Sequence, residues 1–313
     1  MPKGWMILSV GAVAMTALLL LFCWQLYKLA IHRNRKTFLA SDPNMPKVEE
    51  DEAVREIREW YRSQPFEEVS IRSHDGLTLR GDYLEAAEPT GQAAILAHGY
   101  SGQRGDMAAF ARFYRELGFN VLLPDSRGHG SSDGHYIGFG WHDRKDYARW
   151  VEYLVGRIGP GARIVLHGVS MGGGTVLMAS GEPLPEQVKC IISDCAYSSV
   201  ADILKYQLKQ MFKLPAFPLI PITSLICKWK AGFFFGEASA VRQVGRAEKP
   251  ILLIHGDRDT YVPTSMSNDL FGAIRGEKER LIVPGAQHGT SFLVDPHGYR
   301  RAVLGFIGRH GFR

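Results

Sequence analysis

The sequence predicts an α/β fold in which a mostly parallel central sheet is covered by helices on both faces. From residue 93 onward, short apolar runs alternate with segments of helical periodicity. Strands that alternate with helices are typical of parallel sheets. Three of the apolar runs end in His-Gly, at His98, His167 and His255. Each therefore delivers a loop to the carboxyl edge of the sheet, where open α/β sheets place their binding sites.

The expected elements follow one another along the chain. Residues 69–72 and 77–83 alternate apolar and polar side chains around Asp75-Gly76, which predicts a β-hairpin. Charged and apolar residues at helical spacing predict a helix over 48–61 that packs one face on the body. The further strands are expected at 93–97, 121–123, 163–166, 188–193, 251–254 and 280–283, and helices at 106–117, at 143–155 and after Ser170.

An apolar run over residues 6–22 is long enough to cross a bilayer, with Trp5, Trp24 and Tyr27 near its ends. A cleaved signal peptide is the alternative, but bulky residues follow the run and offer no small-residue cleavage site. We favour an uncleaved, single-pass membrane anchor. The basic flank at 32–36 outweighs the charge before the run, and the positive-inside rule then puts the body in the cytoplasm.

The charge and cysteine content exclude several other classes. Five of the 37 basic residues and none of the 32 acidic ones lie in 1–40, so the rest of the chain has no net charge. Nothing in the body therefore indicates a nucleic-acid partner. The four cysteines form no disulfide framework, since Cys190 and Cys195 bracket one extended segment about 17 Å long.

The pattern Gly-x-Ser-x-Gly occurs twice, and its context separates the two copies. Around Ser170, a β-branched run leads directly into the pattern and a helix-compatible segment follows. This strand-turn-helix context is what a nucleophile elbow requires, with small residues on both sides of the serine. Around Ser132, the preceding apolar run ends earlier and a glycine-rich loop follows. Ser170 is therefore the candidate nucleophile, and Ser132 is interpreted as a loop serine.

A nucleophilic serine needs a base and a group that orients the base, and in this topology they follow in the order acid, then histidine. His288 follows the last expected strand on a glycine-containing loop, whereas His297 lies further along the chain and His310 ends the terminal helix. We therefore favour His288 as the base.

Three aspartates are candidates for the orienting acid. Asp259 can project toward the site from the loop after 251–254, while Asp257, closer to that strand, is expected to cap the turn. Asp194, at the end of the preceding strand, remains an alternative. For the oxyanion hole, we expect the backbone N–H groups of Met171 and Tyr100.

These motifs together resemble the α/β-hydrolase superfamily, and most closely its bacterial membrane-anchored members with a serine-aminopeptidase-like core. The resemblance runs from about residue 66 to the end. It implies an α/β-hydrolase domain over 66–313 with a small helical cap at about 196–245, after an anchor at 1–40 and a linker with a juxtamembrane helix at 41–65. It also implies a triad and oxyanion hole at Ser170, Asp259, His288, Tyr100 and Met171. Ser132 would belong to a structural turn of the family.

The expected function is hydrolysis of a carboxylic ester or related acyl bond through an acyl-serine intermediate. The substrate would be a small or lipid-like acyl compound, and the pattern indicates no metal or organic cofactor. A serine aminopeptidase or thioesterase is the alternative within enzymes, because the family covers esterases, lipases, thioesterases and peptidases. A membrane-tethered binding protein on the same fold is the non-enzymatic alternative.

Overall fold

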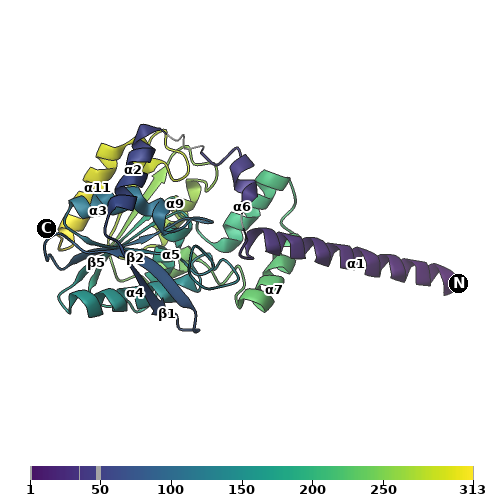
Figure 1. Cartoon of the computed structure of the whole chain (residues 1–313). Coiled ribbons are helices and arrows are strands. Elements are labelled where there is room, and N and C mark those ends of the chain that lie inside the picture. The colour runs from purple at the N-terminus through teal and green to yellow at the C-terminus, as the bar shows by residue number, and fades with distance from the viewer. Residues whose placement is uncertain (1, 35, 47–50, 313) are drawn as a thin grey trace.

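The computed structural model describes residues 2–34, 36–46 and 51–312 of the chain. An eight-stranded sheet in the order β1-β2-β4-β3-β5-β6-β7-β8 forms its centre (Figure 1). β1 and β2 are antiparallel to their neighbours, and every pairing from β4 to β8 is parallel. The strands are β1 Glu67–Arg72, β2 Thr78–Leu84, β3 Gln92–Ala97, β4 Asn120–Pro124, β5 Arg163–Val169, β6 Val188–Asp194, β7 Ile251–Gly256 and β8 Lys278–Val283.

Helices cover both faces of this sheet, which confirms the fold class expected from the sequence. On one face, aromatic residues of α3 (Ala108–Glu116) and α11 (Pro296–Arg309) enter the same core as Leu96 and Val165. On the other face, α4 (Asp143–Ile158), α5 (Met171–Ala179) and α9 (Ser265–Ala273) pack with Ile95 and Ile164. Because side chains alternate along a strand, each central strand contributes to both cores.

The helix expected over 48–61 is α2 (Glu52–Ser63), and residues 47–50 lie outside the described part of the chain. The Asp51 side chain accepts a hydrogen bond from Val54 N and so caps its first turn. Trp60 and Tyr61 pack against the core that α3 covers. The helix expected over 106–117 begins instead as a 3₁₀ turn, η2 (Arg104–Met107), before α3.

The segment between β6 and β7 contains three helices, which cover the region where the resemblance implies a cap. They are α6 (Val200–Phe212), α7 (Leu219–Ala231) and α8 (Ala240–Val244). Both α6 and α7 lie at the inner end of the N-terminal helix (Figure 1).

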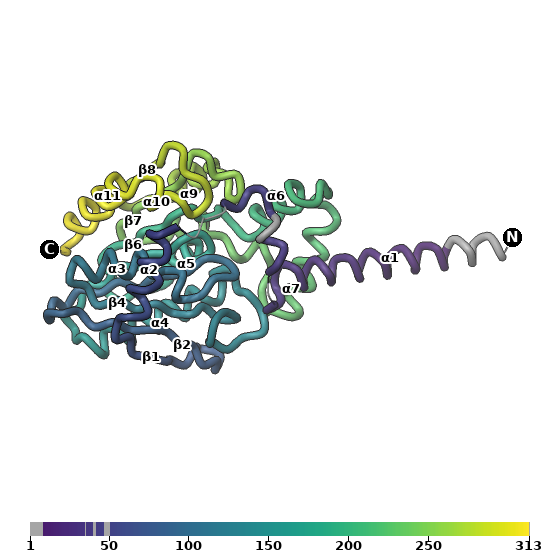
Figure 2. The backbone as a smooth tube through the Cα atoms, turned by 45° about the horizontal axis from the view of Figure 1, so that its top comes forward, coloured from purple at the N-terminus to yellow at the C-terminus, as the bar shows by residue number. Residues whose placement is uncertain are grey.

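The N-terminal helix α1 (Pro2–Ala30) projects away from the domain (Figure 2). Its portion Ser9–Ala30 is 22 residues long and apolar enough to span a membrane. The last two turns differ from the projecting part, because Cys23, Tyr27 and the following Ile31 are buried in the core of the domain. The inner end of α1 therefore packs with the domain, beside α7.

In the basic flank after α1, Arg33 bonds to the domain and Lys36 bonds back to the end of α1 and to His32. The Arg33 guanidinium donates hydrogen bonds to the carbonyls of Gly130, Ser132 and Gly134 at 2.7, 2.7 and 3.2 Å. The buried Lys36 ammonium donates to the carbonyls of Leu29 and His32 at 2.6 and 2.9 Å, and burial lowers its pKa to about 8. The side chains of Trp5 and Arg35 lie outside the described residues.

Candidate active site

Ser170 stands in the sharp turn between β5 and α5. Its φ of 56° lies in the left-handed region, which is costly for a residue with a side chain. The turn also forces very close backbone contacts: a Cβ on Gly168 would overlap the Gly172 carbonyl, and one on Gly172 would overlap the Ala97 carbonyl. Glycine at both positions is therefore a steric requirement, and the strained backbone presents the serine side chain at the carboxyl edge of the sheet.

The structure brings together the three side chains that the sequence placed in a triad. His288 Nε2 lies 2.8 Å from Ser170 Oγ, and His288 Nδ1 lies 2.7 Å from Asp259 Oδ2. An ionised carboxylate only accepts hydrogen bonds, so Nδ1 carries the imidazole proton. Nε2 is then the acceptor for the Ser170 hydroxyl, which is the arrangement a general base requires.

Asp259 is held as a carboxylate by its surroundings. Its Oδ1 accepts hydrogen bonds from Tyr261 N and Val262 N at 3.0 and 2.8 Å. Burial alone would raise the pKa of Asp259, but hydrogen bonds from His255 and His288 outweigh it and lower the pKa to about 2. The side chain therefore remains a fixed acceptor for His288 throughout the neutral pH range.

A second histidine contacts the same carboxylate, and the sequence analysis gave it no role at the site. His255 Nε2 lies 3.2 Å from Asp259 Oδ2 and 2.9 Å from the Val262 carbonyl. Burial opposes the charged form of His255, but the neighbouring Asp259 raises its pKa. The sequence signal for this contact is the spacing His255-x-x-x-Asp259. A loop of this length can turn the Asp259 side chain back toward the end of β7, where His255 lies. His255 orients the acid much as the acid orients His288.

The alternative acids and bases lie elsewhere. Asp257 is exposed and accepts a hydrogen bond from Gly285 N at 2.7 Å, so it braces the loop that leads to His288. Asp194 is buried, its carboxylate accepts from Ser291 Oγ at 3.2 Å, and burial raises its pKa to about 6. His297 is exposed on α11, and His310 is the residue that ends α11.

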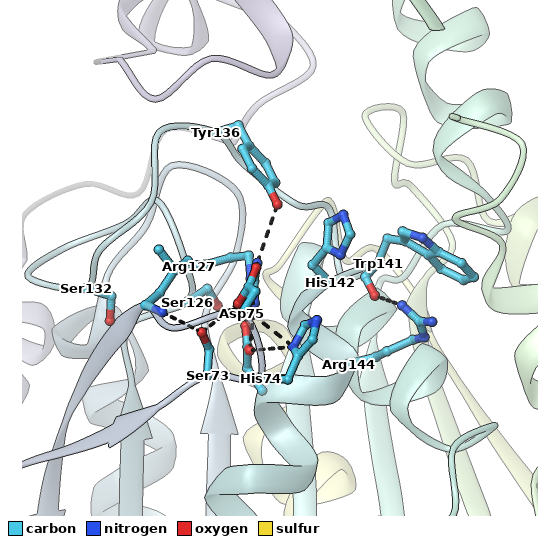
Figure 3. Close-up of polar contacts among 12 residues, drawn as sticks. Ser73, His74, Asp75, Ser126, Arg127, Ser132, Tyr136, Trp141, His142 and Arg144 are labelled. Carbon is cyan, nitrogen blue, oxygen red and sulfur yellow. Dashed lines mark hydrogen bonds and ion pairs between the residues drawn. The ribbon is translucent and has the colours of Figure 1, made fainter. Parts of the chain in front are cut away.

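Ser132 belongs to a turn that its own hydroxyl stabilises by hydrogen bonds. Its hydroxyl donates to the Asp125 carbonyl at 2.7 Å and accepts from Arg80 N at 2.8 Å. The adjacent buried Arg127 bridges Asp146 and Asp75, and so ties α4 to the turn of the β1–β2 hairpin (Figure 3). These contacts agree with interpreting the second Gly-x-Ser-x-Gly as structural.

The expected oxyanion residues lie beside the nucleophile. Tyr100 and Met171 line the same pocket as Ser170, and a Cβ on Gly99 would lie 3.6 Å from Ser170 Cβ. Met171 is also the first residue of α5, so its N–H belongs to the unpaired end of a helix. The Tyr100 side chain points elsewhere: its hydroxyl donates to the Ala30 carbonyl at 2.7 Å, at the end of α1.

Above Ser170 lies a mostly apolar pocket with about 820 Å³ of space, part of it open to solvent. Ser170 and Met171 form one side of it. No aspartate or glutamate lines it in the part of the chain that the structure describes. The other walls come from α1 (Leu26, Leu29, Ala30), the 3₁₀ turn after it (Phe38), α6 (Ile203, Leu204, Gln207, Leu208, Met211, Phe212), α7 (Ile220, Thr223) and surrounding loops (Tyr100, Phe139, Tyr197, Phe235, Tyr261, Val262).

One donor set at the site has the spacing of a metal centre. One ligand atom from each of Cys195, Asp259 and His288 lies within 4.8 Å of the other two. Both His288 nitrogens, however, are already engaged with Ser170 and Asp259. Burial also raises the pKa of the Cys195 thiol well above its usual range, which disfavours a thiolate ligand. The arrangement fits proton transfer better than metal binding.

Comparisons with known proteins agree with this architecture. A family model described as alpha/beta hydrolase fold matches residues 94–219. The uncharacterized protein YqkD of Bacillus subtilis is 30% identical over 237 residues, covering 76% of this chain and 77% of its own. The uncharacterized protein YfhR of Escherichia coli K12 is 28% identical over 249 residues, covering 77% and 80%.

Solved structures show the same fold. An esterase of Pyrococcus furiosus superposes with a TM-score of 0.66 at 22% identity, over 85% of this chain and 97% of its own. An acylaminoacyl peptidase of Pyrococcus horikoshii superposes with a TM-score of 0.59 at 19% identity, over 81% of this chain and 43% of its own. Because it is 30% identical in sequence to YqkD and matches the family model, the chain belongs to the α/β-hydrolase family.

Proposed function

We propose that this protein is a serine hydrolase that cleaves a carboxylic ester or a related acyl bond through an acyl-serine intermediate. The observation that carries the proposal is the continuous hydrogen-bond chain from Ser170 Oγ through His288 to Asp259. Each link is shorter than 3 Å, each member is buried, and Ser170 lines the pocket. A binding protein on this fold would have no need to hold the three groups in this relation.

The chemistry follows from that geometry. Ser170 Oγ attacks the acyl carbon while its proton passes to His288 Nε2, and Asp259 stabilises the imidazolium. His288 then gives the proton to the leaving oxygen as the bond to the acyl carbon breaks. A water molecule, deprotonated by His288, releases the acid and restores Ser170. The N–H groups of Tyr100 and Met171 would stabilise the oxyanion at both stages.

The pocket favours an acyl ester over the substrate of an aminopeptidase. An aminopeptidase has to bind a protonated α-amine, and a buried cation requires a carboxylate partner. The described lining offers none, whereas its leucines, isoleucines and aromatic side chains match an acyl chain. A thioester shares the acyl half of the molecule, so this lining accommodates an ester and a thioester equally well.

We also propose that α1 anchors the chain in the membrane once, with the hydrolase domain in the cytoplasm. The length and apolar character of Ser9–Ala30 support the anchor. The excess of basic residues after the helix supports the orientation. The full chain should stay with membranes in alkaline carbonate and leave only with detergent. Release by carbonate, or a mature N-terminus beyond residue 24, would contradict the anchor.

The experiment that tests the enzymatic function uses the purified full chain in detergent. A fluorophosphonate probe should label Ser170, as located by peptide mass spectrometry, and the labelled protein should lose all turnover. A panel of p-nitrophenyl esters, an acyl thioester and an aminoacyl p-nitroanilide then assigns the bond. Turnover of the anilide alone would make the protein an aminopeptidase. Absence of both labelling and turnover would favour the binding protein.

A further inference from the structure

Building on the proposed function, we propose that the substrate is a long-chain acyl ester of a membrane lipid, which enters the pocket from the bilayer beside α1. The membrane helix itself forms part of the pocket wall: Leu26, Leu29 and Ala30 line it together with α6 and α7. An anchor that only tethered the enzyme would have no side chains in the substrate pocket. Here the helix that touches lipid at one end touches the acyl chain at the other.

The length of α1 places that pocket at the membrane surface. The part of α1 before its first buried residue, from Pro2 to Phe22, is about 31 Å long at 1.5 Å per residue, and only Leu19 in it is described as packing against the domain. The hydrocarbon core of a bilayer is about 30 Å thick. The hydrocarbon therefore ends where Cys23 becomes buried against α7. Trp24 lies at this level with the ammonium groups of Lys28 and Lys230 at 5.8 and 5.6 Å from its ring, as expected for interfacial residues.

The outer face of the cap region has the character of a membrane-contacting surface. Fifteen large apolar side chains are exposed among the described residues; seven lie on α1, and five between residues 212 and 234. Trp229 is 75% exposed, Leu225 60% and Phe212 43%. The cap region 196–245 also carries six basic and two acidic residues, which complements anionic headgroups. Because α7 packs directly along α1, this surface faces the bilayer that α1 crosses.

Phe212 connects this surface to the pocket. It lines the pocket and is also exposed on the outer face of the cap region. One apolar side chain of α6 therefore belongs both to the exposed surface and to the pocket that Ser170 lines. A lipid acyl chain following the pocket wall would bring its ester to Ser170 Oγ. Acyl transfer to Ser170 releases the lipid alcohol, and water then releases the fatty acid.

The first test compares two leucines of α1 in the full chain reconstituted into phosphatidylcholine–phosphatidylglycerol vesicles. Leu29→Trp puts a larger side chain in the pocket wall and so narrows the pocket. Leu18→Trp instead changes a residue that is 67% exposed on the projecting part of α1. Leu29→Trp should lower kcat/KM for 1-oleoylglycerol in the vesicles by about 10-fold or more. A change of this size is expected when an acyl chain no longer fits a hydrophobic pocket by a few carbon atoms. The loss should be larger for 1-oleoylglycerol than for p-nitrophenyl acetate, whose acetyl group occupies little of the pocket, and labelling of Ser170 by the fluorophosphonate reports an intact fold. Leu18→Trp should behave like wild type on both.

The second test concerns access from the bilayer. Leu225→Glu places a charge on the outer face of α7, and Leu304→Glu places one on α11 as the matched control. Only Leu225→Glu should reduce hydrolysis of vesicle-embedded 1-oleoylglycerol, while both keep activity on p-nitrophenyl acetate. If the two glutamate variants lost equal activity on 1-oleoylglycerol, or if the two tryptophan variants did, the inference would be wrong. The proposed serine hydrolase activity would not be affected by that result. A wild-type protein inactive on p-nitrophenyl acetate and unlabelled at Ser170 would instead contradict the proposed function.

Discussion

The same five-residue pattern, Gly-x-Ser-x-Gly, forms two different structures in this protein. Ser170 lies between β5 and α5, with φ at 56° and its hydroxyl 2.8 Å from His288 Nε2. Ser132 lies in a turn where its hydroxyl bonds to Asp125 O and Arg80 N. In each case a carbonyl of an aspartate at or just beyond a strand end takes part: Asp194 O accepts from Ser170 N, and Asp125 O accepts from Ser132 Oγ.

The difference teaches which part of the serine the fold uses. At Ser170 the backbone N–H bonds to the neighbouring strand, which leaves the hydroxyl free for the histidine. At Ser132 the hydroxyl itself closes the turn and satisfies the buried N–H of Arg80. A hydroxyl that a turn needs for its own stability is not available as a nucleophile. The following predictions test this distinction, beginning with the largest effect.

Exchanging each serine for alanine should separate the two roles most sharply. Ser170→Ala should reduce kcat by roughly 10⁶-fold with an unchanged fold, because triad members act as a unit. Ser132→Ala should keep kcat but lower the free energy of unfolding by about 1–3 kcal/mol, since it leaves a buried N–H without its acceptor. Ester turnover and urea unfolding measure the two effects. Activity lost in Ser132→Ala at full stability would reverse the assignment.

The pair Asp259 and Asp257 tests what makes the Ser170 hydroxyl reactive. Asp259→Asn should lower kcat by about 10⁴-fold, because an amide no longer fixes the His288 tautomer with Nε2 free to accept. Asp257→Asn is the matched control, since it can still accept from Gly285 N at the exposed turn and should change kcat and stability only slightly. NMR of the His288 ring nitrogens should show the tautomer change in Asp259→Asn alone. A comparable loss in both variants would mean that the loop, not the tautomer, matters.

The pH dependence of the free energy of unfolding tests the burial of Asp194, which ends β6 next to Ser170. Burial raises its folded pKa to about 6, above the ordinary value of 3.8, so the folded state binds more protons than the unfolded state between these values. The free energy of unfolding should therefore fall by about 2 kcal/mol from this group as pH rises from 4 to 6. Asp194→Asn should remove that decline, because the amide oxygen still accepts from Ser291 without ionising. Urea unfolding in detergent at several pH values measures it, and parallel curves for the two proteins would refute the assignment.

Local patterns in the sequence determined the sheet, the elbow and the order of the candidate triad. Alternating apolar and helical runs specify strands and helices through short-range physics. Glycines on both sides of Ser170 are dictated by the close backbone contacts of one turn. The choice of His288 over His297 and His310 followed from its position just after a strand. These features depend on residues near one another in the chain, so their pattern can be recognised without coordinates.

Tertiary structure alone decided how distant segments share one site. His288 reaches Ser170 and Asp259 across 118 and 29 residues of chain, and no local pattern specifies those distances. Likewise, Leu26 and Leu29 follow the predicted membrane-spanning run, Arg33 and Lys36 belong to its basic flank, and the sequence predicts no place in the domain for any of the four. The fold instead packs the end of α1 beside α7, so the leucines line the pocket and both cations bond to backbone carbonyls. An apolar side chain can bury itself in lipid or in protein with similar gain, and only the packing of α1 against the cap region selects between them.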